Sequence, residues 1–300
     1  MSLRVWFWLL SLSVLWGGSF FFAKVALADL GPLTIVFARV GGAALALNFA
    51  AIAVSQSLWR RDTPWPAFIA MGVLNNLIPF SLIFWGQIYI GSGLASILNA
   101  TTPLFTVLVA HVFTADEKVT PPKLAGVLAG IAGVAVLLGP KANSVFDGGV
   151  WGQLACLGAA VSYAFAGVYG RRFKTRGIAP LQAAAGQVTA TTILILPIML
   201  IVEPPWHLPA LPSATTWASL AGLSLLSTAL AYLLYFRILA AAGATNLLLV
   251  TFLIPPVAIL LSITILGERL ETSQLAGLAL IGMGLAAIDG RIWGLLRPAK

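Results

Sequence analysis

Long apolar runs cover almost the whole chain, and short stretches rich in charge, proline and glycine separate them. A helix that crosses a bilayer needs about 20 mostly apolar residues, so runs near this length predict membrane-spanning helices. The pattern predicts ten such helices. They cover residues 5–27, 32–54, 66–90, 94–114, 123–139, 150–170, 179–202, 215–240, 245–266 and 274–290.

The second half of the chain repeats motifs of the first half. Leu124-Ala125-Gly126 returns as Leu275-Ala276-Gly277, 151 positions later. Each copy holds five predicted helices, and an odd number of crossings places the second copy upside down in the membrane. The sequence therefore predicts two inverted repeats, residues 1–140 and 141–300, and secondary transporters with this architecture bind their substrates where the repeats meet.

Composition and charge agree with an all-α integral membrane protein. Of the 300 residues, 60% are hydrophobic and 9% are charged, with a mean hydropathy of +0.98. We assign the net charge of +8 to insertion orientation and not to nucleic-acid binding, because cytoplasmic loops of membrane proteins collect Lys and Arg.

The basic residues predict the orientation of the chain. With the N-terminus in the cytoplasm, 13 basic residues fall on the cytoplasmic side and two, Lys141 and Arg269, on the opposite side. The 13 are Arg4, Arg60, Arg61, Lys118, Lys123, Arg171, Arg172, Lys174, Arg176, Arg237, Arg291, Arg297 and Lys300. We therefore expect both termini in the cytoplasm.

The sequence predicts no cofactor, no metal site and no enzyme. It has one cysteine, Cys156, and two histidines that lie far apart, His111 and His207. It therefore lacks the clusters that hold metals or form disulfides. Asp and Glu fall only in loops or at span ends. Carriers that exchange protons for lipophilic cations normally use a buried carboxylate, so this pattern favours movement down a gradient without a coupling ion.

Polar residues inside the predicted spans are costly in lipid and are therefore candidates for substrate binding. Asn75 and Asn76 lie near the middle of the third span, and their helical face continues through Phe80 and Phe84. Adjacent amides in hydrocarbon need several partners or water, which favours a functional role over a purely structural one.

The eighth span carries its own polar residues at a similar depth. Ser224, Ser227 and Thr228 are followed along one side by Tyr232. Hydroxyl groups also bond readily to their own helix backbone or tie helices together, so both a binding role and a structural role stay open for them.

Three further groups complete the candidate site. Asn99 and Thr102 share one face of the fourth span, and Trp16 and Phe20 of the first span, with Tyr163 of the sixth, are candidates for aromatic walls. The prolines within spans serve either as hinges or as fixed bends. They are Pro103, Pro255 and Pro256.

Arg39 is the one cation well inside a predicted span, about a third of the way across, and its repeat counterpart is Gln187. A charge there costs about 2.5–3.5 kcal/mol on insertion scales. It either binds a carboxylate group of the substrate or has a structural role, in which its long side chain reaches the interface or a helix end.

Small residues mark the fifth and tenth spans as packing helices. Gly126 and Gly130 are four positions apart, as are Gly282 and Ala286, and this spacing lets helix backbones approach closely. We favour packing within the chain over dimerisation and therefore expect a monomer.

The chain resembles EamA-type carriers of the drug/metabolite transporter superfamily over nearly its whole length. The resemblance rests on Trp16-Gly17, Pro32-Leu33, Arg39, Pro103, Glu117 and Leu124-Ala125-Gly126 in the first half. In the second half it rests on Ala231-Tyr232-Leu233-Leu234-Tyr235-Phe236-Arg237, Gly243-Ala244-Thr245, Pro255, Gly267-Glu268-Arg269-Leu270 and Leu275-Ala276-Gly277. It implies a ten-helix carrier that moves a small metabolite by alternating access.

Within the superfamily the chain is most similar to YddG-type bacterial exporters of aromatic amino acids and methionine. The resemblance implies a multi-pass protein of the bacterial inner membrane, whose partners are an amino acid and the lipid bilayer. The alternative within carriers is a transporter of sugar phosphates or nucleotide sugars. That function needs several cations in the cavity, and only Arg39 and Lys24 are available. An integral membrane enzyme and a channel are disfavoured, because the spans lack catalytic pairs and charged pore rings.

Overall fold

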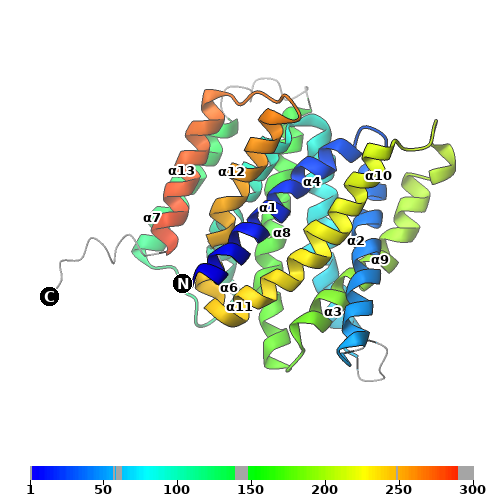
Figure 1. Ribbon diagram of the computed structural model, residues 1–300. Coiled ribbons are helices and arrows are strands. Elements are labelled where there is room, and N and C mark those ends of the chain that lie inside the picture. Colours follow the sequence, from blue (N-terminus) through cyan, green and yellow to red (C-terminus); the bar gives the residue numbers. More distant parts are fainter. Residues whose placement is uncertain (1, 57, 59–62, 139–147, 248, 290–300) are drawn as a thin grey trace.

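The computed structural model describes residues 2–56, 58, 63–138, 148–247 and 249–289, and these residues form helices and no strand. The helices pack side by side as one bundle (Figure 1). In chain order they are α1 (Leu3–Ala26), α2 (Pro32–Ala53), α3 (Trp65–Gly72), η1 (Val73–Leu77), α4 (Ile78–Tyr89), α5 (Ser92–Asn99), α6 (Thr102–Phe113), α7 (Pro121–Leu138), α8 (Gly149–Thr175), α9 (Pro180–Val202), η3 (Pro205–His207), α10 (Ala214–Ala221), η4 (Gly222–Leu230), α11 (Ala231–Leu247), α12 (Leu249–Thr264) and α13 (Thr272–Asp289).

These elements make a multi-pass membrane protein. Among the described residues, nine helical runs are long and apolar enough to cross a bilayer. The run Trp65–Tyr89 joins α3, η1 and α4, and the run Ala214–Gly243 joins α10, η4 and most of α11. The predicted span 245–266 corresponds to α12, which has 16 residues and is shorter than the others. It follows Gly243, whose φ of 77° interrupts the preceding helix.

Two further predicted spans differ from the observed helices. α8 extends to Thr175 and not to residue 170, because its last turn contains Arg172 and Lys174. Cationic side chains favour the C-terminal end of a helix and let it continue past the lipid. The predicted span 94–114 divides into α5 and α6, and Pro103 lies in the first turn of α6. Proline fits that position because a first-turn backbone N–H has no helical partner.

The two small-residue helices, α7 and α13, pack against each other at one edge of the bundle (Figure 1). A Cβ atom added to Gly284 would lie 2.5 Å from the carbonyl oxygen of Gly126. One added to Gly133 would lie 2.8 Å from the carbonyl oxygen of Gly277. Packing within the chain is thus observed, but it uses Gly277 and Gly284 and not Gly282, which has no atom within 4 Å of an added Cβ.

Acidic residues in loops cap the N-termini of helices elsewhere in the chain. The Glu203 carboxylate accepts from the backbone N–H groups of Leu33 and Thr34, at 3.1 and 2.8 Å. Glu268 does the same for Ser92 and Gly93, at 2.8 and 3.2 Å. The first N–H groups of a helix have no helical acceptor and carry a partial positive charge. These carboxylates therefore bind helix ends that would otherwise be unsatisfied.

The start of α1 and the end of α13 lie on the same side of the bundle, the lower side in Figure 1. That agrees with an even number of crossings. It does not identify which side is cytoplasmic, and the prediction of that side rests on the basic residues. Of the residues counted for orientation, six lie outside the described part of the chain. They are Arg60, Arg61, Lys141, Arg291, Arg297 and Lys300.

The glycine contacts predict opposite effects for two substitutions on α13. Gly284→Ala places a methyl group against the α7 backbone, and we expect overpacking to lower the stability by about 1–3 kcal/mol. Gly282→Ala meets open space and should be neutral or slightly stabilising, since Ala favours helix more than Gly. Thermal unfolding in detergent measures both. Equal melting temperatures for the two variants would contradict this packing.

The cap at Asp29 predicts a pH-dependent stability. Its carboxylate accepts hydrogen bonds from Thr216 Oγ1 at 2.6 Å and from the backbone N–H of Ser213 at 2.7 Å. These hydrogen bonds favour the ionised carboxylate and lower the pKa of Asp29, and the bond from Thr216 has the largest effect. The stabilisation is thus complete above the ordinary aspartate pKa, about 3.9, and is lost as the pH falls through the lowered pKa.

We therefore expect Asp29→Asn to lower the melting temperature at pH 7 and to lower it less as the pH decreases toward 3. A difference between the two proteins that stays constant over that range would show that the charge of Asp29 has no part in the cap.

Candidate functional site

Two segments of π-helix form the local framework of the site. η1 lies within the third predicted span and η4 within the eighth, so each half of the chain contributes one. A π-helix inserts an extra residue into a helical turn, and such segments are frequent at functional sites. Backbone groups that lose regular partners must find others inside the protein, and Ser162 of α8 donates to the carbonyl oxygen of Leu74 at 2.7 Å. η1 presents Asn75 and Asn76, and η4 presents Ser227 and Thr228.

The first part of the site is the amide cluster, defined as Asn75, Asn76, Gln187, Thr191 and Tyr232. Asn75 Nδ2 donates to Gln187 Oε1 at 2.9 Å and to the Tyr232 hydroxyl at 3.1 Å. That hydroxyl donates to Asn76 Oδ1 at 3.4 Å, and Asn76 Nδ2 donates to Thr191 Oγ1 at 3.4 Å. The cluster thus joins η1 with α9 and α11. Asn76 is fully buried, whereas Asn75 and Tyr232 are partly accessible.

The second part is the arginine cluster, defined as Arg39, Phe80, Phe84 and Thr228. Arg39 retains 6% of its accessible surface. Its Nε donates to Thr228 Oγ1 at 3.0 Å, and its guanidinium carbon lies 3.8 Å from the centre of the Phe80 ring. The centre of the Phe84 ring lies 5.8 Å from the same carbon. An aromatic face attracts a cation most strongly where water is excluded.

The environment of Arg39 therefore differs from the structural role predicted from the sequence, in which the side chain reaches the membrane interface or a helix end. The side chain does not reach a helix end, because a hydroxyl of η4 and the rings of α4 hold it at the centre of the bundle. The hydroxyl of Tyr232 belongs to the amide cluster, and the phenols of Tyr163 and Tyr232 lie within electrostatic range of the guanidinium. The two clusters thus form one polar centre that α2, η1, α4, α8, α9, η4 and α11 surround.

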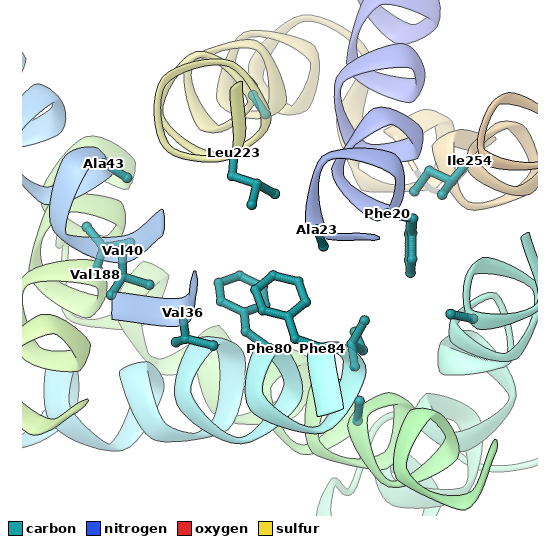
Figure 2. Packing of buried hydrophobic residues seen from close by; sticks show 14 of the residues in the cluster. Phe20, Ala23, Val36, Val40, Ala43, Phe80, Phe84, Val188, Leu223 and Ile254 are labelled. Atoms are coloured by element: carbon teal, nitrogen blue, oxygen red, sulfur yellow. The ribbon is translucent and has the colours of Figure 1, made fainter. Parts of the chain in front are cut away.

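Aromatic side chains form the apolar part of this centre. Figure 2 shows the rings of Phe80 and Phe84 projecting from α4 toward Leu223 of η4 and Ala23 of α1. Phe20 is buried on α1, and its carbonyl oxygen accepts from Gln87 Nε2 at 2.9 Å. Trp16 lies one turn earlier, with its ring centre 5.8 Å from that of Tyr235.

Several predicted site residues take no part in either cluster through a described hydrogen bond, among them Ser224, Thr102, Asn99 and Ser227. Ser224 packs against Gly42, where an added Cβ would lie 2.8 Å from Ser224 Oγ. Thr102 donates to the carbonyl oxygen of Asn99 at 2.7 Å, within its own chain turn. Asn99 Oδ1 is buried and has no hydrogen-bond partner in the described part of the chain, and the same holds for Ser227 Oγ.

The three prolines occupy two different environments. Pro103 lies in the first turn of α6, whereas Pro255 and Pro256 lie inside α12, which continues through them. Here α12 approaches α1 closely, since a Cβ added to Gly17 would lie 3.0 Å from the carbonyl oxygen of Ile254. A role as hinges or as fixed bends stays a prediction for all three prolines.

Sequence reasoning missed Thr191 and Gln87. Thr191 lies four positions after Gln187 on α9, a spacing that puts both on one helical face, so periodicity offered a signal. Gln87 showed no such signal, because its role depends on the neighbouring helix. Lys24 also donates to the carbonyl oxygens of Gln87 and Ile90, at 2.6 and 3.1 Å, and thereby caps the end of α4.

A separate cavity of about 400 Å³ lies at the end of the bundle where α8 and α9 join. Leu58, Phe68, Arg176 and Gln182 are among its lining residues, and no predicted site residue lines it.

The apolar helical spans and the buried polar centre define a polytopic helical membrane protein. A sequence model described as the EamA-like transporter family matches residues 3–139 and, a second time, residues 150–288. The chain belongs to the EamA-like transporter family. It is a multi-pass protein of the bacterial inner membrane.

Several curated relatives align along nearly their entire length. The chain is 29% identical to a "Probable terminal-alkyne amino-acid exporter" of Streptantibioticus cattleyicolor, covering 98% of this chain and 96% of the relative. It is 27% identical to a "Probable amino-acid metabolite efflux pump" of Salmonella typhimurium, with coverages of 95% and 94%. It is also 27% identical to the "Uncharacterized inner membrane transporter YedA" of Escherichia coli K12, with coverages of 97% and 92%.

A solved structure, described as the crystal structure of a protein, shares the fold. Its TM-score is 0.68 at 22% sequence identity, and the match covers 95% of this chain and 97% of the other.

The bond between Arg39 and Thr228 predicts a selective loss of stability. Thr228→Val preserves the shape and removes the acceptor of a buried guanidinium N–H, so we expect a cost of about 1–3 kcal/mol. Thr192→Val is the matched control, since among the described residues the Thr192 hydroxyl bonds only to the carbonyl oxygen of Val188 on its own helix. Thermal unfolding compares the two variants, and an equal effect would mean that the bond to Arg39 contributes nothing.

Proposed function

We propose that the protein is a secondary carrier that exports aromatic and other apolar amino acids, including methionine, across the inner membrane by alternating access. The observation that carries the proposal is the polar centre, where a buried arginine and an amide cluster lie against aromatic rings. Such a site offers a cation for a carboxylate, amides for hydrogen bonds and an apolar wall for a side chain. The names of two relatives, an exporter and an efflux pump for amino-acid compounds, support the same substrate class.

The proposal includes two inverted repeats, residues 1–140 and 141–300. The pairing of α7 with α13 supports it, because Gly126 meets Gly284 while Gly133 meets Gly277. From the first pair to the second, the position on α7 rises from Gly126 to Gly133 while the position on α13 falls from Gly284 to Gly277. The two helices are therefore antiparallel. Gly277 and Gly284 also follow Gly126 and Gly133 by 151 positions. Equivalent residues thus exchange places across the contact, as a two-fold axis in the membrane plane requires.

The single buried cation favours a carboxylate over a phosphate substrate. A phosphate group carries more charge than a carboxylate and is usually met by several Lys or Arg side chains. Among the described residues the polar centre contains only Arg39, and the Lys24 amine is engaged with two carbonyl oxygens at the end of α4. A sugar-phosphate carrier is therefore less well supported.

The acidic residues support transport without proton coupling. Three of the described carboxylates, Asp29, Glu203 and Glu268, bind helix ends, and Asp116 and Glu117 pair with Arg171. None of these groups lies in the polar centre. In this proposal the substrate moves down its own gradient.

Uptake into proteoliposomes tests the substrate class. We expect transport of labelled tryptophan, phenylalanine and methionine, no transport of a sugar phosphate or a quaternary ammonium dye, and little stimulation by a pH gradient. Transport of the phosphate or the dye without any of the amino acids would overturn the substrate assignment. Strong stimulation by the pH gradient would overturn the uncoupled mechanism alone.

Asn76→Ala tests the amide cluster within the same assay. Loss of a buried hydrogen-bonding group should lower the uptake about tenfold at unchanged protein yield, and Trp16→Ala should act in the same direction. Asn48→Ala is the matched control, because Asn48 on α2 likewise donates to a threonine of α9, Thr189, at 2.7 Å. Equal losses of uptake for the Asn76 and Asn48 variants would mean that both residues only hold helices together.

A further inference from the structure

The guanidinium of Arg39 has one unused side. Its Nε bonds to Thr228, and Phe80 covers one of its faces. The two terminal nitrogens, Nη1 and Nη2, have no hydrogen-bond partner among the described residues. They are also not among the fully enclosed polar atoms, so each retains some accessible surface. Their parallel N–H groups match the two oxygens of a carboxylate.

The positive charge of Arg39 has no counter-ion within the described part of the chain. The charged and titratable groups in electrostatic range are the phenols of Tyr163 and Tyr232. The other groups near the guanidinium are neutral. They are the Thr228 hydroxyl, the rings of Phe80 and Phe84, and the amide groups that bond to Tyr232. A buried charge without a partner is unfavourable, and a ligand of opposite charge relieves that cost.

We infer that the polar centre recognises apolar monocarboxylates by their net negative charge and does not require the ammonium group of an amino acid. The inference rests on the proposed function, since it concerns the same site. A monoanion makes the complex with Arg39 neutral, whereas a zwitterion brings an ammonium group that leaves the centre with one uncompensated positive charge. Carboxylates without an amine, such as 3-phenylpropionate, thus suit the site at least as well as the corresponding amino acids.

Binding of four related ligands to the purified protein at pH 7.5 tests the inference. L-Phenylalanine has both charged groups, 3-phenylpropionate has only the carboxylate, and phenethylamine and L-phenylalaninamide have only the amine. We expect 3-phenylpropionate to bind as tightly as phenylalanine or more tightly. We expect both amines to bind at least about 30-fold more weakly, because they leave the buried charge unpaired. Calorimetry measures binding directly and avoids the passive membrane permeation of the uncharged acid.

Each outcome has a separate meaning. Binding of phenylalanine without 3-phenylpropionate would overturn the inference and leave the proposed function intact. Binding of 3-phenylpropionate without any amino acid would support the inference and overturn the amino-acid assignment. Binding of neither would overturn both, and binding of the amines as tightly as of the acid would overturn the charge argument.

Arg39→Gln connects the selectivity to this residue. We expect the variant to lose at least about 30-fold in affinity for 3-phenylpropionate and to lose the preference for acid over amine. Asn48→Ala on the same helix should retain both, and an unchanged preference in the Arg39 variant would overturn the inference. The ligand series on the unmodified protein tests the proposal independently, even where the Arg39 variant unfolds.

Discussion

A cation buried in a lipid-embedded bundle is the constraint on which the centre of this protein depends. Arg39 lies among apolar helices, where a charge costs several kcal/mol unless polar or aromatic groups surround it. The protein meets that cost without a carboxylate in the described residues, through the Thr228 hydroxyl and the Phe80 ring. Because these groups come from α2, η4 and α4, the arginine holds together helices from both halves of the chain.

The same physical requirement shapes the helix ends. Lipid offers no hydrogen bonds, so helix termini near it need partners from the protein. Glu203 and Glu268 supply them at the starts of α2 and α5, and Lys24 supplies them at the end of α4. Several of the charged residues thus close backbone ends or pair with one another, and among the described residues the polar centre contains a single cation. The candidate site is positively charged because the described acidic side chains bind groups elsewhere in the protein.

Much of the fold could be predicted because the bilayer restricts the possible structures. Only helices satisfy their own backbone in lipid as single segments, so each long apolar run indicated a helix, and the bounds differ by few residues at most ends. The observed helices depart from the predicted spans where the local backbone geometry changes, and hydropathy does not predict such changes. α5 and α6 separate before Pro103, and η1 and η4 each contain an extra residue per turn. Asn75, Asn76 and Tyr232 could be selected as polar residues at one depth, but their hydrogen-bond partners could not.

By itself, the sequence determined the class of protein, the approximate helix bounds and the positions of costly polar residues, because hydrophobicity and spacing are properties of the linear chain. The tertiary structure decided which of those residues meet. It turned Arg39 toward Phe80 and Thr228 and placed Ser224 in a helix contact. It also paired Gly126 with Gly284 and not with Gly282. These contacts depend on the relative orientation and distance of helices that are far apart in the sequence. Hydropathy does not determine either of these quantities.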